Sequence, residues 1–393
     1  MLLDAIQQAL QRESLDGWLF FDHHRRDPLA YRILGLPESA KATRRWYYFI
    51  PASGDPRKLV HQIESGILDT LPGKKASYSS WVEQHRELKS LLSTVSSNAK
   101  RIAMQYSPQC SIPYISLVDA GTYELVTGSG VEVVTSANLV QEFEARWSEK
   151  QLETHLAAGR KVDRVRRDAF LFIGSSLRSG DPVNEFQVQQ FVRDRFSEEG
   201  LITDHGPIVG ANANASDPHY EPSADRHAYI QNGDVVLIDL WAKLSDQDAV
   251  YYDITWTGYC GQSIPDQVAN VFDVVMQARV RTCDFVKGRV RVQATLCGYQ
   301  VDDVCRGSIA ERGFGQYFFH RTGHNIGTEV HGTGANMDNL ESHDDRLVIP
   351  GTCFSVEPGV YLPAFGIRSE VNVFVGESEA RVTGEEQREL IRI

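Results

Sequence analysis

Cysteine is scarce in this sequence, and none of its six cysteines belongs to a Cys-x-x-Cys pair. The pattern therefore indicates neither a disulfide framework nor a thiolate zinc site. No apolar stretch reaches the roughly 20 residues that span a membrane, and the amino terminus lacks the basic start and apolar run of a signal peptide. We expect a cytoplasmic protein in a reducing environment, with no membrane partner.

Positive charge is also in short supply. The chain has 40 Lys and Arg against 52 Asp and Glu, which gives a net charge of -12. A surface of that sign repels phosphate backbones, so nucleic acid is not an expected partner.

Length, in contrast, is ample, because 393 residues exceed what one hydrophobic core usually serves. Two domains are therefore expected.

The hydrophobic pattern changes near residue 147. Residues 1–147 alternate short apolar runs with helical and turn-rich segments, as in an α/β domain. The domain over 148–393 has helical or strand-like runs at 145–174, 184–196, 234–244, 249–259, 266–287, 300–312, 323–332, 351–362 and 365–375. The order of helix, helix and hairpin occurs twice, which predicts an α+β domain of two related halves.

Asp239 and Asp253 occur on two β-rich runs that a short polar segment joins. Each lies seven residues from Asp246, so a hairpin centred there would place the two carboxylates directly opposite each other. Opposed like charges destabilise a hairpin, and Asp239 stands in the apolar run VVLIDLW, where a solvated carboxylate is out of place. A cation is the simplest neutraliser of such a pair.

Glu357 and Glu370 repeat this construction, because they are equidistant from a turn between residues 363 and 364. Between the hairpins, a Gly-rich segment supplies three histidines, His320, His324 and His331. Any one of these residues alone would more commonly be structural. Together, four carboxylates and one imidazole suit two divalent ions with shared ligands. Such ions activate water, so hydrolysis is the expected reaction.

The chain from about residue 150 to its end resembles the pita-bread metallopeptidases, the family of methionyl aminopeptidase, aminopeptidase P and prolidase. The likeness rests on PHY (218–220), the Asp239 and Asp253 hairpin, HRTGHNIG (320–327), His331, SVEPGVY (355–361) and GIRSE (366–370). It implies a pita-bread catalytic domain after a smaller creatinase/prolidase-like α/β domain. It also implies two divalent ions per subunit, with manganese the first choice and cobalt(II) or zinc the alternatives.

The resemblance implies a role for each matched residue. Asp239 holds one ion, His324 and Glu357 hold the other, and Asp253 and Glu370 bridge the two. Glu357 is also the expected proton carrier.

Four further residues correspond to catalytic or substrate-binding positions of that family. His219 and His331 match histidines that hydrogen-bond the charge developing on the scissile carbonyl. His320 matches a substrate-side histidine, with a structural hydrogen bond as the alternative. Arg368 matches an arginine that braces either the carboxylates or a substrate carboxylate, and both roles stay open.

Three departures from the family pattern concern the pocket and not the ligands. Leu240 and Trp241 follow Asp239 where a small residue or Gly is usual, the Asp hairpin is longer than typical, and Gly332 replaces an acidic residue after His331. These departures bear on the shape of the substrate pocket and on the tuning of His331.

The extra amino-terminal domain points to the proline-specific branch, since methionyl aminopeptidases generally consist of the catalytic domain alone. The first hypothesis is an Xaa-Pro dipeptidase that acts on a dipeptide or short peptide. Aminopeptidase P, which takes longer Xaa-Pro peptides, is the alternative, and a catalytically silent peptide-binding module is the alternative of another class. The resemblance implies a homodimer. In the segment 21–35, Arg25 or Arg26 would then either cap a substrate carboxylate or belong to a solvated basic loop.

Overall fold

The computed structural model describes residues 3–37, 39, 41–93 and 100–393. The chain divides into two compact units, Met1–Glu144 (unit 1) and Ala145–Ile393 (unit 2). Within the described ranges, no helix is both long and apolar enough to cross a membrane.

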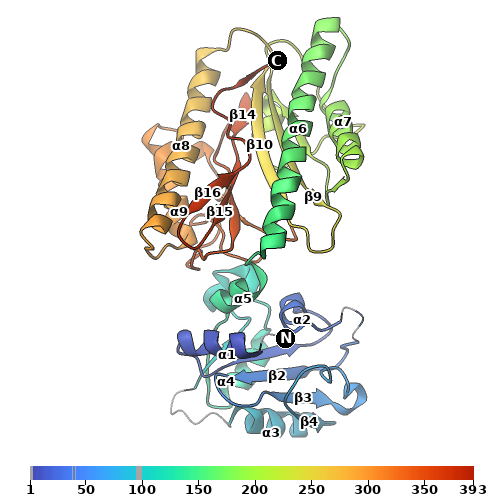
Figure 1. Cartoon of the computed structure of the whole chain (residues 1–393), viewed down its shortest axis with the longest axis vertical. Coiled ribbons are helices and arrows are strands. Elements are labelled where there is room, and N and C mark those ends of the chain that lie inside the picture. The colour runs from blue at the N-terminus through green and yellow to red at the C-terminus, as the bar shows by residue number, and fades with distance from the viewer. Residues whose placement is uncertain (1–2, 38, 40, 94–99) are drawn as a thin grey trace. The chain divides into compact units, whose positions relative to one another are not determined.

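Unit 1 contains a mixed sheet (Figure 1). A hydrophobic core lies on each face of this sheet. Its described strands follow the order β4-β3-β2-β1-β5-β6, with β1 Gly17–Asp22, β2 Trp46–Pro51, β3 Arg57–His61, β4 Lys74–Tyr78, β5 Arg101–Met104 and β6 Glu132–Thr135. Successive side chains of a strand point to opposite faces, so Trp18 enters one core and Leu19 the other. The first core includes α1 Leu3–Arg12, α2 Pro28–Leu34 and α5 Ala137–Glu144, and the second α3 Trp81–Leu92 and α4 Ala120–Thr127.

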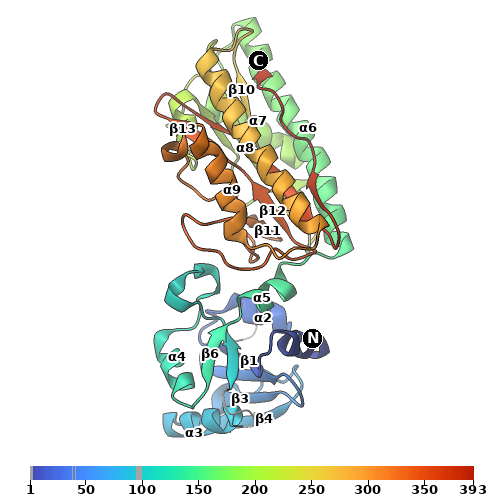
Figure 2. The ribbon, with the colours of Figure 1, turned by 90° about the vertical axis from the view of Figure 1, so that its left-hand side faces the viewer.

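Unit 2 places strands between two pairs of helices (Figure 1). The helices are α6 Glu149–Ser179, α7 Glu185–Glu198, α8 Asp266–Arg291 and α9 Gly298–Glu311, and α8 and α9 lie side by side (Figure 2). One sheet contains β7 Leu201–Ile202, β8 Ile208–Ala211, β9 Val235–Leu244, β10 Tyr252–Tyr259 and β17 Ile391–Arg392. The others contain β11 Asn325–Ile326, β12 Cys353–Val356, β13 Gly359–Leu362, β14 Phe365–Arg368, β15 Val371–Val375 and β16 Ala380–Thr383.

Helix α6 shows how local sequence signals build this unit. Ser148 caps its first turn and forms a reciprocal capping box with Gln151, and Gly180 ends the helix in the left-handed conformation. The helix packs on the face of β9 and β10 that carries Ile238 and Ile254. That packing leaves the opposite face of the hairpin, with Asp239 and Asp253, for the centre of the unit.

The predicted order of helix, helix and hairpin is confirmed in both halves of unit 2, with helix ends that shift by a few residues. The strand predicted over 323–332 is wrong for most of its length, because only Asn325 and Ile326 pair with β12. Beyond them the chain closes a loop on itself, in which Gly332 N donates to Asn325 O at 2.7 Å.

The register predicted for the aspartate hairpin is also wrong. Asp239 pairs with Thr255, and Asp253 pairs with Trp241, so the two aspartates are diagonal neighbours on one face. The β9–β10 ladder ends before the turn because the two backbone N–H groups that precede β10 donate to atoms outside the hairpin. Those of residues 250 and 251 donate to Thr154 Oγ1 and Gly327 O.

Candidate metal centre

Two hairpins carry the four predicted carboxylate ligands. The register of the second hairpin is the predicted one, with Val356 opposite Val371 and Gly359 opposite Arg368. Glu357 and Glu370 therefore face each other where both strands are interrupted. Pro358 helps to cause the interruption, since proline has no N–H to donate to a ladder.

His324 approaches the carboxylates from β11 and the turn before it. Its backbone N–H donates to Ser355 Oγ at 2.9 Å, and its C=O accepts from Ser355 N at 2.9 Å. A Cβ on the preceding Gly323 would lie 1.9 Å from Ser355 O, so this close approach requires glycine. The ring Nδ1 lies 3.2 Å from Asn325 O. A carbonyl can only accept, so Nδ1 carries the proton and Nε2 keeps its lone pair for a cation.

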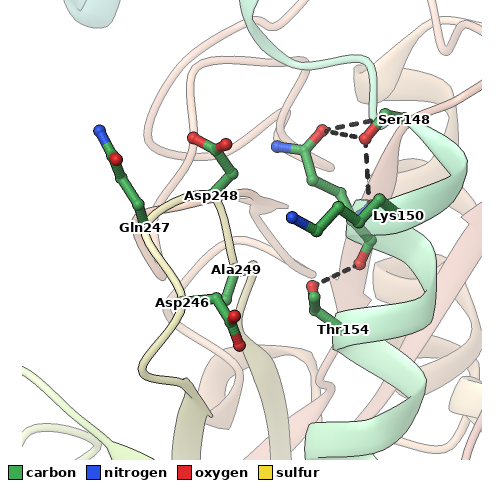
Figure 3. Close-up of a pocket in the computed structure, with 8 residues that line it drawn as sticks. Ser148, Lys150, Thr154, Asp246, Gln247, Asp248 and Ala249 are labelled. Atoms are coloured by element: carbon green, nitrogen blue, oxygen red, sulfur yellow. Dashed lines mark hydrogen bonds between the residues drawn. The ribbon is translucent and has the colours of Figure 1, made fainter.

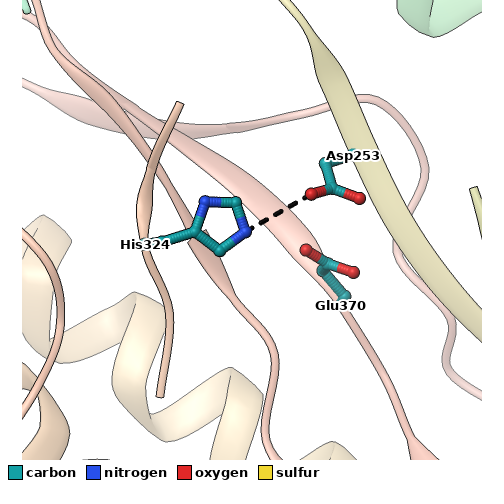
Figure 4. Close-up of side chains that lie close together, drawn as sticks. All are labelled: Asp253, His324 and Glu370. Atoms are coloured by element: carbon teal, nitrogen blue, oxygen red, sulfur yellow. Dashed lines mark ion pairs between the residues drawn. The ribbon is translucent and has the colours of Figure 1, made fainter. Parts of the chain in front are cut away.

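Three of the five predicted ligands form a compact cluster. The ligand atoms of Asp253, His324 and Glu370 lie within 4.8 Å of one another, and all three residues are buried (Figure 4). His324 Nε2 is 3.4 Å from Asp253 Oδ2 and 3.5 Å from Glu357 Oε1. This cluster could hold a metal ion, with Glu357 beside it.

The fifth predicted ligand, Asp239, is ion-paired with Arg368 Nη2. The same guanidinium reaches the cluster, because its Nε lies 4.0 Å from Glu357 Oε2 and donates to Thr255 Oγ1 at 2.9 Å. Thr255 in turn donates to Glu370 Oε2 at 2.8 Å. Arg368 therefore lies against Asp239 and Glu357 directly and reaches Glu370 through Thr255.

Burial controls the electrostatics of the cluster. Loss of solvation raises the pKa of Asp239 to about 6 and the pKa of Asp253 to about 7. It also raises the pKa values of Glu357 and Glu370 and lowers the pKa of His324. Every group is thus pushed towards its neutral form, which is the electrostatic condition that a multivalent cation relieves.

The other predicted site histidines differ in their surroundings. His320 is fully engaged inside the protein, because Nδ1 donates to Arg321 O and Nε2 accepts from Tyr361 Oη, both at 2.7 Å. Burial lowers the pKa of His320 to about 3, so its ring is neutral. The exposed His331 packs edge-on against the His324 ring at 4.3 Å between centroids. His219 is exposed, and its backbone N–H donates to Asp217.

Two residues of this region, Thr255 and Glu185, were not predicted from the sequence. Thr255 links Arg368 to Glu370. Its position two residues after Asp253, and so on the same face of the strand, could have predicted that it lies near the carboxylates. Glu185 is fully buried and binds the segment that carries His219. Its carboxylate accepts from Ala211 N, Asn214 Nδ2, Tyr220 Oη and Ala228 N at 2.6–3.0 Å.

A separate surface pocket of about 300 Å³ lies between the start of α6 and the turn of the aspartate hairpin (Figure 3). Its lining includes Ser148, Lys150, Thr154 and residues 246–249, and it contains none of the predicted ligands. We assign it no part in the metal centre.

Comparison with known proteins supports the family indicated by this geometry. Probable dipeptidase PepE of Mycobacterium tuberculosis is 28% identical over 257 residues, or 65% of this chain and 63% of that protein. The Xaa-Pro dipeptidase of Lactobacillus delbrueckii subsp. lactis is 29% identical over 225 residues, or 56% of this chain and 55% of that protein. The matched part therefore spans less than two thirds of these relatives.

A solved structure shows the same fold over the whole chain. Dipeptidase PepE from Mycobacterium ulcerans matches 100% of this chain and 96% of its own, with a TM-score of 0.68 and 23% identity. The predicted pita-bread fold is confirmed. The sequence profile of Metallopeptidase family M24 matches residues 153–377, which is more than half of the chain. The chain belongs to metallopeptidase family M24.

Proposed function

We propose that this protein hydrolyses the Xaa-Pro peptide bond of dipeptides with the help of two divalent metal ions. The observation that carries the proposal is the buried cluster of Asp253, His324 and Glu370, with Glu357 and Asp239 beside it. A relative at 29% identity bears the name Xaa-Pro dipeptidase, which supports the choice of substrate.

The donor set fits divalent ions. Four carboxylates balance the charge of two such ions, and oxygen donors with one imidazole suit manganese first, with cobalt(II) or zinc as alternatives. Asp239, Asp253, His324, Glu357 and Glu370 would hold the ions, with Asp253 and Glu370 shared between them. When bound, the ions would lower the pKa of a water molecule and polarise the scissile carbonyl.

Glu357 is the proposed proton carrier. It is nearly buried, and its carboxylate lies between the His324 ring at 3.5 Å and the Arg368 guanidinium at 4.0 Å. Burial raises its pKa above the ordinary value, which favours a group that takes a proton and gives it back. The leaving nitrogen of a proline bond is tertiary and must be protonated as it departs, so such a carrier is needed.

The other predicted site residues would either bind the substrate or hold neighbouring side chains in place. His331, packed on His324, and His219 would donate hydrogen bonds to the charge that develops on the carbonyl oxygen. Arg368 holds Asp239 and braces Glu357, which favours the bracing role over direct capture of a substrate carboxylate. His320 keeps a structural role, because both its ring nitrogens have partners inside the protein.

Four wider features complete the proposal. Unit 1 is the creatinase/prolidase-like amino-terminal domain, the protein is cytoplasmic, and it forms a homodimer. Arg25 or Arg26 of the exposed segment in unit 1 would then contribute to binding a dipeptide carboxylate. Unchanged Michaelis constants in the Arg25→Ala and Arg26→Ala variants would remove that last assignment.

Substrate length tests the proposal directly. The full chain, supplied with Mn²⁺, is assayed on an Xaa-Pro dipeptide and on the same peptide extended by one residue. We expect the dipeptide to have the higher kcat/KM. A clear preference for the longer peptide would assign the chain to the aminopeptidase P type instead. Lack of stoichiometric metal after manganese supplementation would favour the silent peptide-binding module.

A further inference from the structure

Strand β10 has two edges, and the second is not covered by a strand along most of its length in the described structure. One edge pairs with β9 throughout, whereas on the other β17 pairs only with Gly258 and Tyr259. Because β10 is buried, the backbone N–H and C=O groups on that second edge need other partners. Two side-chain amides, from Asn372 and Gln387, supply them at Asp253 and Thr257, and a backbone N–H binds the carbonyl of Thr255 between the two.

The Asn372 amide binds both backbone polar groups of Asp253. Its Nδ2 donates to Asp253 O at 2.5 Å, and its Oδ1 accepts from Asp253 N at 3.1 Å. Asn372 is fully buried and Asp253 nearly so. A buried backbone group that loses its partner is left unsatisfied at high cost, so this amide fixes the strand at the residue predicted to bridge two metal ions.

The Gln387 amide makes the same pair of bonds at Thr257. Its Nε2 donates to Thr257 O at 2.6 Å, and its Oε1 accepts from Thr257 N at 3.0 Å. Gln387 is fully buried as well. Thr257 lies four residues beyond Asp253, roughly 13 Å along an extended strand. The two amides are thus matched in chemistry and burial, but only that of Asn372 binds a predicted ligand.

Asn372 also belongs to the segment that carries the second bridging carboxylate. It lies two residues after Glu370, whose N–H donates to Thr255 O at 3.0 Å. The Asn372 side chain therefore joins the backbone of Asp253 to the strand that Glu370 precedes. A change in the Asn372 contact would change the separation of two carboxylates whose ligand atoms now lie within 4.8 Å of each other.

We propose that Asn372 is a positioning residue that sets the spacing of Asp253 and Glu370 for metal binding. The inference rests on the proposed function, because it assumes that these carboxylates bind divalent ions. Asn372 acts through the backbone of Asp253 and contacts neither metal nor substrate.

The test measures metal binding without any peptide. Full-chain protein freed of metal is titrated with MnCl₂ in a calorimeter, as wild type and as the Asn372→Ala and Gln387→Ala variants. We expect Asn372→Ala to weaken Mn²⁺ binding by about 10–100-fold, the usual range when a group that orients a metal ligand is lost. Gln387→Ala is expected to bind Mn²⁺ as the wild type does, although both variants should unfold at a lower temperature.

Two results would overturn the proposal. One is wild-type Mn²⁺ affinity in Asn372→Ala, and the other is an equal loss in both variants, which would assign the effect to general destabilisation. If Asn372→Ala does not fold, Asn372→Asp decides in the same way, because its carboxylate still accepts from Asp253 N–H but repels the Asp253 carbonyl oxygen.

The outcome is separable from that of the peptidase assay. A wild type that binds Mn²⁺ but cleaves no Xaa-Pro peptide would contradict the proposed function and leave the role of Asn372 standing. A wild type that binds no Mn²⁺ would contradict both. The absorption spectrum of bound Co²⁺ gives a second readout, which Asn372→Ala should change and Gln387→Ala should not.

Discussion

Among the regions of this protein that bury carboxylates, the Asp22–Asp27 segment of unit 1 and the candidate metal cluster of unit 2 differ in the partners that they offer. In unit 1, Asp22 and Asp27 flank the segment that contains Arg25 and Arg26. Asp22 accepts hydrogen bonds from three backbone N–H groups and from the hydroxyl of Tyr31, at 2.7–3.1 Å. In unit 2, the carboxylate of the equally buried Asp253 has the His324 ring at 3.4 Å as its nearest ionic partner. Protein donors therefore satisfy Asp22, whereas Asp253 is left for a cation.

A raised pKa does not distinguish the two regions. Burial raises the pKa of Asp27 to about 7, the same value as for Asp253. Asp27, however, belongs to no group of converging ligand atoms among the described residues. One of its oxygens caps α2 at Ala30 N, and the other is buried without a hydrogen-bond partner in the described part of the chain. Asp253 converges with other ligand atoms. The convergence of donors, and not burial alone, therefore distinguishes the candidate metal centre.

The largest expected effect comes from removing the proposed proton carrier of unit 2. Glu357→Gln keeps the size of the side chain but cannot exchange a proton at neutral pH. We expect kcat on an Xaa-Pro dipeptide to fall by about 10²–10⁴-fold, the usual contribution of general acid–base catalysis. Glu379→Gln, at an exposed position of the same unit, is the control and should retain activity. A Glu357→Gln enzyme with wild-type kcat would exclude this residue as the carrier.

Asp27, which is buried in unit 1, should make the free energy of unfolding depend on pH. The folded pKa of about 7 lies above the unfolded value of 3.8, so the folded state binds the proton more tightly. The stability of unit 1 is therefore intact below pH 3.8, falls as pH rises towards 7, and stays reduced above it. Three pKa units correspond to an upper limit of about 4 kcal/mol.

The variant Asp27→Asn isolates this effect, because asparagine caps a helix without a charge. We expect the variant to be more stable than the wild type at pH 8 and of similar stability at pH 4. Hydrogen exchange of the α2 amides in the full chain measures the difference at each pH. A variant that is less stable at pH 8 would show that the charged carboxylate is favourable there.

The sequence predicted the fold class of unit 2 and one of its two hairpin registers. The glutamate register was predictable because the short turn at residues 363 and 364 sets it, with Leu362 opposite Phe365. The aspartate register was not, because it depends on the bond between Tyr251 N and Gly327 O, whose partners are far apart in the chain. The Asn372 contact, which spans 119 positions, is hidden from local patterns for the same reason.

Added metal should stabilise the candidate metal cluster of unit 2 and leave the Asp22–Asp27 segment of unit 1 unchanged. Mn²⁺ at 100 times its Kd should stabilise unit 2 by about 2.7 kcal/mol through binding to the folded state alone. Hydrogen exchange should show slower exchange in β10 and β15 and unchanged exchange in α2. Asp253→Asn should abolish the response, whereas Asp22→Asn should keep it. Protection of α2 by Mn²⁺ would contradict the proposed difference between the Asp22–Asp27 segment and the candidate metal cluster.

The smallest expected effect concerns Thr255, whose buried hydroxyl hydrogen-bonds both Arg368 and Glu370 in unit 2. Thr255→Val keeps the shape of the side chain and removes the bonds to Arg368 Nε and Glu370 Oε2. A hydrogen bond to a charged group such as the Arg368 guanidinium contributes about 1.5–3 kcal/mol. We therefore expect a loss of that size in denaturant unfolding of the metal-free protein.

Thr282→Val provides the matched control, because Thr282 is equally buried and its hydroxyl donates to the neutral carbonyl of Ala278 within α8. The loss of stability in Thr282→Val should be the smaller of the two, since the bond it removes is to a neutral carbonyl. Equal losses in the two variants would mean that Thr255 contributes no more than a neutral hydrogen bond. The electrostatics of the centre would then depend on the Arg368 and Asp239 pair and on the metal ions.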